Sequence, residues 1–277
     1  MTRRVSIITA AYGPKADYLD EAMRSVLAQD MPEGWEFEWL IQEDGTDPQL
    51  ADKFADLPNV HYAANEAQAG AAVSRNFALA RATGELVQVL DHDDVLLPHA
   101  LRTLIPHFED PQVGWACGQA DDLLSDGTRT SYESAMPFGT IDAGAVNSWA
   151  IDHEANWPVH CAALMMRTDL IRAAGGWAAS PIDEDIIMFS ALSELSAGYN
   201  DEAVTWLYRI HDQQTHKTDT SRLHSQTGRQ IALQRIQALS RVGLNLNGQP
   251  VPTRQFEASV GEAVKYNVAP GATWWNS

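Results

Sequence analysis

An acidic run, Asp91-His92-Asp93-Asp94, directly follows the apolar segment 85–90. Carboxylates this close repel one another and are costly to bury when ionised, so a divalent cation is a natural partner for them. Oxygen ligands favour Mg²⁺ or Mn²⁺, which keep coordination positions free for water and substrate phosphate. The run therefore predicts a metal site that receives a phosphate or diphosphate. A solvated acidic turn is the alternative for the run taken by itself.

The first hundred residues alternate strand and helix patterns that would position this run. Interleaved strands and helices imply right-handed crossovers and a mostly parallel sheet, in which ligands bind beyond the carboxyl ends of the strands. Glu43-Asp44-Gly45 and the acidic run both fall at such ends, where we expect a nucleotide. The expected strands are 5–10, 37–42, 60–62 and 85–90, and the expected helices are 18–29, 48–54 and 71–82, the last with Val73, Phe77 and Ala80 on one side.

The second half is less regular. Residues 121–157 are rich in Ser, Gly, Asp and Thr and predict an elaborated loop region, which in compact domains is usually functional. We divide the chain into a nucleotide-sugar-binding half (1–118), an acceptor and catalytic-base half (119–223) and a C-terminal helix and tail (224–277). The expected strands of this part are 113–117 and 162–166, and the expected helices are 169–174, 186–195 and 225–242.

Composition narrows the class of protein. A chain of 277 residues can bury one sizeable core, and a formal net charge of −18 argues against nucleic acid as a partner. Bound cations would locally invert that charge for an anionic substrate. The sequence has no signal-peptide pattern and no membrane-length apolar stretch, so we expect a cytoplasmic protein without a membrane span. Cys117 and Cys161 lack metal-site or redox spacing, so we expect buried apolar residues.

Several segments, in order from about residue 5 to about residue 216, resemble the family 2 glycosyltransferases. These are inverting enzymes with the GT-A fold, so the resemblance implies an α/β chain with a Rossmann-like, mostly parallel sheet flanked by helices and an acceptor-side second half. The segments are 5–12, 19–29, Ile41-Gln42-Glu43-Asp44-Gly45-Thr46-Asp47, Gly70-Ala71-Ala72-Val73-Ser74-Arg75-Asn76, Leu90-Asp91-His92-Asp93-Asp94, Gly175-Gly176-Trp177 with Asp183-Glu184-Asp185, and 208–216.

The resemblance assigns donor-binding residues. It places Thr9, Ala11 and Tyr12 along the base and ribose of a nucleotide sugar. It makes Glu43 or Asp44 the acceptor of the nucleobase N–H, although the family usually has Asp where Glu43 stands. Arg75 would contact the base or diphosphate, with a surface ion pair near the helix N-terminus as the alternative. His92 would lie in the same donor site.

The resemblance also assigns the metal site. Asp93 is implied as a direct ligand of Mn²⁺ or Mg²⁺, and Asp94 as a second ligand or a neighbour of the ligands. Asp91 would bind ribose or a metal-bound water. His211 would complete the metal site or contact phosphate, with a structural histidine as the alternative.

For the chemistry, the resemblance implies Asp185 as the base that takes the acceptor proton, with Glu184 as the neighbour most easily confused with it. Ordinary N-terminal helix capping is the alternative for these acids. Trp157 and His160 would lie near the acceptor, although core packing also explains Trp157.

The function expected from these residues is metal-dependent, inverting transfer of a sugar from a nucleoside diphosphate, UDP or dTDP, to an acceptor hydroxyl. The acceptor would be soluble or at a membrane surface, and a homodimer is a possible assembly. A sugar-nucleotide nucleotidyltransferase is one alternative, but residues 10–15 make a poor phosphate loop. A noncatalytic nucleotide- or sugar-binding module is the other, and it would have no need of a base.

Overall fold

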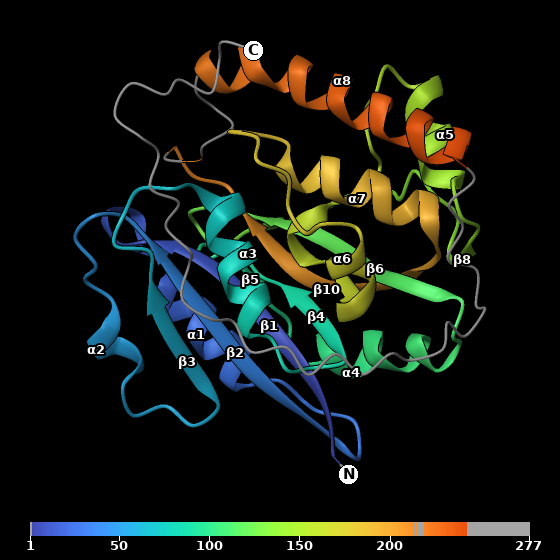
Figure 1. Ribbon diagram of the computed structural model, residues 1–277. Coiled ribbons are helices and arrows are strands. Elements are labelled where there is room, and N and C mark those ends of the chain that lie inside the picture. Colours follow the sequence, from blue (N-terminus) through green and yellow to red (C-terminus); the bar gives the residue numbers. More distant parts are fainter. Residues whose placement is uncertain (1, 213, 215–218, 243–277) are drawn as a thin grey trace, which may run out of the picture.

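A single mixed sheet runs through the computed structural model, which describes residues 2–212, 214 and 219–242 (Figure 1). Its order is β3-β2-β1-β4-β9-β6-β10-β5, with β7 paired to β6 and β8 to β10. The described strands are β1 (Arg3–Tyr12), β2 (Trp35–Asp44), β3 (Val60–Ala64), β4 (Leu86–Val89), β5 (Val95–Leu96), β6 (Val113–Leu123), β7 (Arg129–Ser131), β8 (Gly139–Ile141), β9 (Met165–Arg167) and β10 (Ala197–Arg209).

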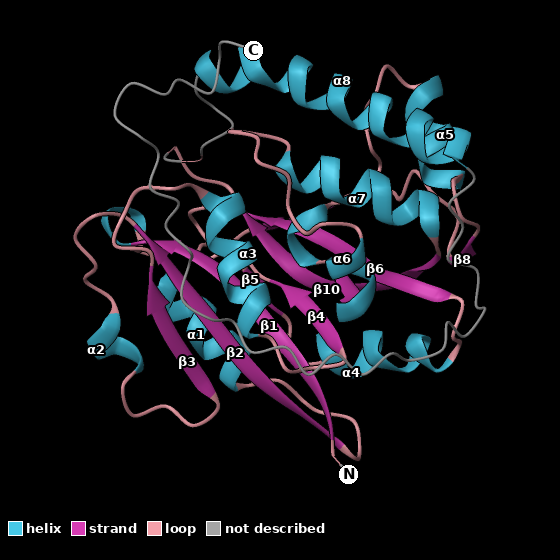
Figure 2. Cartoon of the chain, in the orientation of Figure 1, coloured by secondary structure: helices cyan, strands magenta, loops and turns pink. Residues whose placement is uncertain are grey.

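Helices cover both faces of the sheet (Figure 2). Helices α1, α2 and α4 pack on one face, α3, α5, α6 and α7 pack on the other, and α8 packs on the outer side of α7. No helix in the described part is long and apolar enough to cross a membrane. The helices are α1 (Leu19–Leu27), α2 (Ala51–Phe54), α3 (Ala71–Arg81), α4 (Ala100–Leu104), α5 (Ala145–Asp152), α6 (Thr168–Ala173), α7 (Glu184–Leu195) and α8 (Asp219–Val242), with 3₁₀ turns η1 (Gly13–Lys15), η2 (Ile105–Glu109) and η3 (Cys161–Ala163).

The central strands are apolar on both faces because helices cover both. Val5, Ile7 and Ile8 of β1 are fully buried, as a parallel strand between two helix layers requires. Strand β1 pairs in parallel with β2 and β4, and β2 pairs in parallel with β3. The prediction of a mostly parallel sheet flanked by helices is confirmed.

The carboxyl ends of the strands that carry the site meet at one edge. Strands β4 and β6 both pair antiparallel with β9, so they run parallel to each other. Strand β10 runs parallel to β6. The acidic run that follows β4 therefore lies at the same edge as the ends of β1, β6 and β10.

Helix α3 buries a different side from the one that its large apolar residues suggested. Phe77 is 50% exposed, whereas Ala78 and Leu79 are buried, and so is Arg75. Small alanines let the helix lie close to the sheet, and ion pairs described below draw Arg75 inward. Contacts with other elements, rather than the positions of the large apolar residues, thus decide which side of α3 is buried.

The longest described strand of the second half, β10, has no counterpart among the sequence predictions. Its middle carries the polar residues 200–202, and its pairing with β6 shifts register there, so no regular alternation marks it. Within residues 121–157, expected as loop, the structure also has β7, β8 and α5. The strand expected at 162–166 is the turn η3 followed by β9.

The divisions expected after residues 118 and 223 fall inside β6 and α8, so the halves share one sheet. The expected tail beyond residue 242 lies outside the described residues. Cys117 and Cys161 are buried free thiols, which confirms their prediction as buried apolar residues.

Candidate active site

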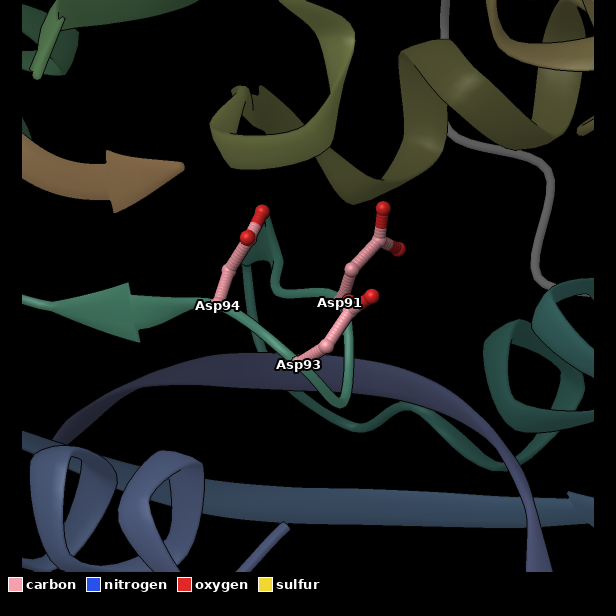
Figure 3. Close-up of side chains that lie close together, drawn as sticks. All are labelled: Asp91, Asp93 and Asp94. Carbon is pink, nitrogen blue, oxygen red and sulfur yellow. The ribbon is translucent and has the colours of Figure 1, made fainter. Parts of the chain in front are cut away.

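Three aspartates converge in the loop after β4. Asp91, Asp93 and Asp94 each place a carboxylate oxygen within 4.8 Å of the others. Their side chains extend from the loop to the same side (Figure 3). A cluster of hard oxygen ligands that leaves room for water and phosphate is the arrangement that Mg²⁺ and Mn²⁺ prefer.

Asp94 supplies the test of whether a cation fits here. It is 1% exposed, and its Oδ1 accepts a hydrogen bond of 2.9 Å from the backbone N–H of Arg209. Its Oδ2 is buried and has no hydrogen-bond partner among the described residues. Burial raises the pKa of Asp94 well above its usual value, and the charges of Asp91 and Asp93 raise it further. A divalent cation would relieve both penalties, so the donor set fits a metal ion.

Asp93 is held by the end of β10. Nε2 of His211 lies 2.9 Å from its Oδ2, and Nε of Arg209 donates to its backbone oxygen at 2.8 Å. Arg209 also pairs with Glu21 of α1 and lies over the ring of Tyr18. His211 thus adjoins the cluster through Asp93, where it orients this carboxylate. Arg209 and Tyr18 were given no role from the sequence, and the closeness of Arg209 to His211 in the chain was the available signal.

Arg75 joins the acidic cluster to helix α7. Its Nη2 lies 2.6 Å from Oδ1 of Asp91, and its Nη1 lies 2.6 Å from Oε1 of Glu184. Burial opposes the charge of the guanidinium, but the two carboxylates outweigh burial and raise the pKa of Arg75. The surface ion pair considered as an alternative is thus wrong in one respect, because the Arg75 side chain is only 9% exposed.

The neighbour of Arg75 fixes the segment that precedes α7. Nδ2 of Asn76 donates to the backbone oxygen of Trp177, and the Trp177 N–H donates to Oδ1 of Asn76, both at 2.9 Å. Gly176 has a φ of +67°, and a Cβ there would lie 2.2 Å from Oδ1 of Asn76. The contact therefore requires glycine at this position.

The surroundings of Asp185 bear on its expected role as a base, which stays a prediction. It lies in the first turn of α7, and its Oδ1 accepts from the Ile186 N–H at 2.8 Å. Burial and the charge of Glu184 raise the pKa of Asp185 to about 7, while Arg75 opposes this rise. A carboxylate with a pKa near neutrality can accept a proton at physiological pH.

Glu43 and Asp44 serve as internal acceptors. Glu43 is 1% exposed and accepts from the N–H groups of Gln49 and Leu50 and from the Tyr62 hydroxyl, at 2.9, 3.0 and 2.6 Å. Asp44 accepts from the N–H groups of Ala69 and Gly70 at 2.6 and 3.1 Å. Both carboxylates hold the loops that follow β2 and β3. The expected hydrogen bond from a nucleobase to one of them stays a prediction.

The residues of β1 that were expected beside the nucleotide are largely buried. Thr9 is fully buried and its hydroxyl accepts from the indole N–H of Trp39 at 2.9 Å, so its side chain is occupied within the protein, and its expected place beside the nucleotide stays a prediction. Ala11 is 2% exposed, and Tyr12, at the end of β1, is half-buried beside Gly45. Nε2 of His92 lies 3.1 Å from the backbone oxygen of Lys15, which connects the acidic run to η1.

Trp157 and His160, the two residues expected near the acceptor, have different surroundings in the structure. Trp157 donates from Nε1 to Asn147 at 2.9 Å and packs on the core, as its alternative explanation required. His160 is exposed, and its ring lies 5.8 Å from that of Trp206 and 5.9 Å from that of Tyr208. His160, Trp206 and Tyr208 thus form an aromatic group beside the acidic cluster.

The sequence matches one family model. The model of "Glycosyl transferase family 2" matches residues 6–170, which include most of β1, Arg75 and the acidic cluster.

Relatives with similar sequences match parts of the chain. An uncharacterized glycosyltransferase of Nostoc is 35% identical over 143 residues, 49% of this chain and 42% of the relative. The putative teichuronic acid biosynthesis glycosyltransferase TuaG of Bacillus subtilis is 39% identical over 92 residues, 32% of this chain and 36% of TuaG. The alignments thus span less than half of these relatives.

Solved structures of S. aureus TarS have a similar fold. The structure of TarS 1-349 in complex with UDP-GlcNAc aligns with a TM-score of 0.59 at 21% identity, covering 76% of this chain and 60% of that one. The structure with UDP aligns with a TM-score of 0.58 at 20% identity. At this identity the likeness identifies the fold, which is the GT-A fold expected from the sequence.

Proposed function

The chain belongs to glycosyl transferase family 2, a family of inverting transferases, and we propose that it moves a sugar from a nucleoside diphosphate to an acceptor hydroxyl with the help of Mg²⁺ or Mn²⁺. One observation carries the proposal. The carboxylate cluster of Asp91, Asp93 and Asp94 is joined by the buried side chain of Arg75 to Glu184, the direct neighbour of Asp185. A cation site and a base of suitable pKa therefore belong to one connected arrangement.

Asp93 and Asp94 are the residues that would hold the cation, with Asp91 beside them and His211 orienting Asp93. A bound Mg²⁺ or Mn²⁺ would supply positive charge for the diphosphate as it departs. The orphaned Oδ2 of Asp94 supports this assignment.

Asp185 is the base in this proposal. The acceptor hydroxyl attacks the anomeric carbon from the side opposite the diphosphate, and its proton passes to the Asp185 carboxylate. The bond from the anomeric carbon to the diphosphate oxygen breaks as the new glycosidic bond forms, without a covalent enzyme intermediate. Arg75 acts through its partners, because it holds Asp91 and Glu184 at fixed positions.

For the donor we favour a uridine nucleotide. The support is the fold shared with TarS, whose structures contain UDP-GlcNAc and UDP. A dTDP sugar is the second choice. The buried free thiols agree with a reducing compartment, for which the cytoplasm is our proposal. The acceptor is soluble or presented at a membrane surface.

Calorimetric titration of the purified protein tests the donor site. UDP, dTDP and GDP are each titrated with Mn²⁺ and with EDTA, on the wild type and on Asp93→Ala. We expect metal-dependent binding of UDP or dTDP that the substitution removes. Failure of every nucleotide to bind in the presence of Mn²⁺ would refute the proposal.

A second substitution separates catalysis from binding. Asp185→Asn keeps the size of the side chain and removes its basicity. Loss of turnover with intact, Mn²⁺-dependent donor binding supports Asp185 as base. Turnover equal to that of the wild type would remove Asp185 from the mechanism.

A further inference from the structure

A cavity of about 380 Å³ is lined by residues of β6, of β10 and of the segment from the end of β7 to β8. Cavities of this size are typical of small-ligand sites, which combine apolar walls with a few polar groups. Its described lining includes Gln119, Asp121, Tyr132, Glu133, Phe138 and Glu202. No role has been assigned to any of these residues above.

Two aromatic rings on its wall are exposed to solvent. Tyr132 is 59% exposed and Phe138 is 53% exposed, and both line the same cavity. Exposed aromatic faces beside hydrogen-bonding groups suit a ligand that is apolar on its ring faces and polar at its edges. A saccharide ring has this character.

A buried acceptor also faces this cavity. Asp121 is 4% exposed, and its Oδ2 accepts from Nε of Arg129 at 2.9 Å. Its Oδ1 is buried without a hydrogen-bond partner in the described part of the chain. An unpaired carboxylate oxygen is costly, and a ligand hydroxyl is a donor that would satisfy it.

The charge of the cavity selects among ligands. Asp121, Glu133 and Glu202 line it, and none of the described lining residues is Lys or Arg. Arg129 neutralises Asp121 alone. A ligand with carboxylate or phosphate groups would be repelled, since like charges in contact are destabilising.

The cavity is connected to the proposed acceptor side. The hydroxyl of Tyr132 donates to Asp122, the neighbour of Asp121 on β6. Asp122 of β6 pairs in register with Tyr208 of β10. The ring of Tyr208 in turn lies 5.9 Å from that of His160. Tyr132 and Asp122 thus link the cavity wall to the aromatic group beside the cluster.

We propose that this cavity is an acceptor subsite that binds an uncharged saccharide unit of the acceptor, with Tyr132 and Phe138 as stacking surfaces and Asp121 as a hydrogen-bond acceptor. The inference rests on the proposed function and adds to it the class of acceptor, a glycan without acidic groups on the bound unit.

The test uses the full-length protein with UDP and Mn²⁺. Binding is measured on immobilised hexose and N-acetylhexosamine trimers and on matched uronic-acid trimers. We expect neutral trimers to bind and uronic-acid trimers to bind at least tenfold more weakly. No binding to any neutral trimer, or equal binding of the acidic ones, would overturn the inference.

Substitutions locate the binding. Tyr132→Ala and Phe138→Ala should each weaken neutral-trimer binding about threefold to tenfold, the range for loss of one aromatic contact. Phe77→Ala on α3, which removes a ring that is also half exposed, is the matched control and should bind like the wild type. Equal binding by Tyr132→Ala, Phe138→Ala and the control would place the glycan elsewhere and overturn the inference.

Charge reversal tests selectivity without disturbing the core, because Glu133 and Glu202 are exposed. The double variant Glu133→Lys, Glu202→Lys should improve binding of uronic-acid trimers about fivefold or more. An unchanged preference would contradict the electrostatic part of the inference.

Calorimetry with UDP on the same preparations separates the two proposals. If the cavity variants bind UDP and glycan as the wild type does, only this inference is refuted. If no nucleotide binds, the proposed function is refuted.

Discussion

Arg75 and Glu184 lie 109 positions apart in the sequence, yet Nη1 of the guanidinium and Oε1 of the carboxylate are 2.6 Å apart. The other terminal nitrogen of Arg75 is equally close to Asp91. With 9% of its side chain exposed, Arg75 is the buried tie between the carboxylate cluster and the helix that carries Asp185.

Arg75→Met should therefore be strongly destabilising. Breaking a buried ion pair leaves uncompensated charge and costs about 3–5 kcal/mol of the free energy of unfolding. Arg102→Met is the matched control, because Arg102 pairs with Asp30 at the surface with 63% and 53% of the side chains exposed. That loss should be about 0–1 kcal/mol. Urea unfolding of both variants measures the two losses in the free energy of unfolding. Equal losses would show that the ion pairs of Arg75 stabilise the protein no more than a surface pair does.

The pH dependence of turnover should report Asp185. A base must be ionised to work, so kcat/KM should rise with pH up to about 7, where the pKa of Asp185 lies, and then level off. Removing the like charge in Glu184→Gln should move this limb to lower pH. Initial rates at saturating Mn²⁺ across the pH range give the limb for each protein. A limb at the same pH in Glu184→Gln would contradict the assigned cause of the shift.

Metal binding should stabilise the protein more at high pH than at low pH. The pKa of Asp94 is raised in the folded state, so its contribution to stability is present below the ordinary aspartate pKa and is lost as pH rises through the raised value. A bound Mn²⁺ offsets the negative charge of the ionised Asp94 carboxylate. It should add about 2.7 kcal/mol to the free energy of unfolding when present at 100 times its Kd. Melting curves with Mn²⁺ and with EDTA at pH 5.5 and pH 8 measure both effects.

Asp94→Asn provides the control for that effect. Asparagine keeps an oxygen for the Arg209 N–H but carries no charge to bury. We expect a higher melting temperature than the wild type in EDTA at pH 8 and a smaller increment with Mn²⁺. A full increment in this variant would mean that Asp94 is not part of the metal site.

His211→Ala should weaken Mn²⁺ binding without abolishing it. His211 orients Asp93 through the 2.9 Å contact, and loss of a residue that orients a ligand typically costs about tenfold to a hundredfold in metal affinity. Calorimetry with Mn²⁺ and UDP measures the change. His211→Gln, which retains a donor, should lose less, and equal affinity in wild type and His211→Ala would remove His211 from the site.

The first half of the fold could be predicted because its signals are local. Apolar strands with acidic or glycine-containing ends, such as 85–90 before Asp91, specify both the element and the side of the sheet. The second half could not, because β10 carries polar residues in its middle and depends on pairing with β6 across a shifted register. Its position is a tertiary property.

The site shows the same division. The acidic run could be found from its composition and its place after a strand. Asp185 comes from the family resemblance, and its role as base stays a prediction. The environment of Arg75 could not, since both of its partners come from distant segments. Thr9 and Glu43 were placed beside the donor by analogy, but their hydrogen bonds to Trp39 and to residues 49 and 50 turn them toward the interior.

Glu43 should accordingly affect stability rather than nucleobase choice. Glu43→Gln keeps the size of the side chain but replaces one of its two accepting oxygens with an NH₂ group. This group only donates, so it cannot accept from the N–H of Gln49 or of Leu50. We expect a loss of about 1–3 kcal/mol in the free energy of unfolding. Glu36→Gln, at a half-exposed ion pair with Arg4, is the control and should lose less. Calorimetry should give the same preference among UDP, dTDP and GDP for Glu43→Gln as for the wild type. A changed preference with unchanged stability would instead return Glu43 to the nucleobase, as the family resemblance implies.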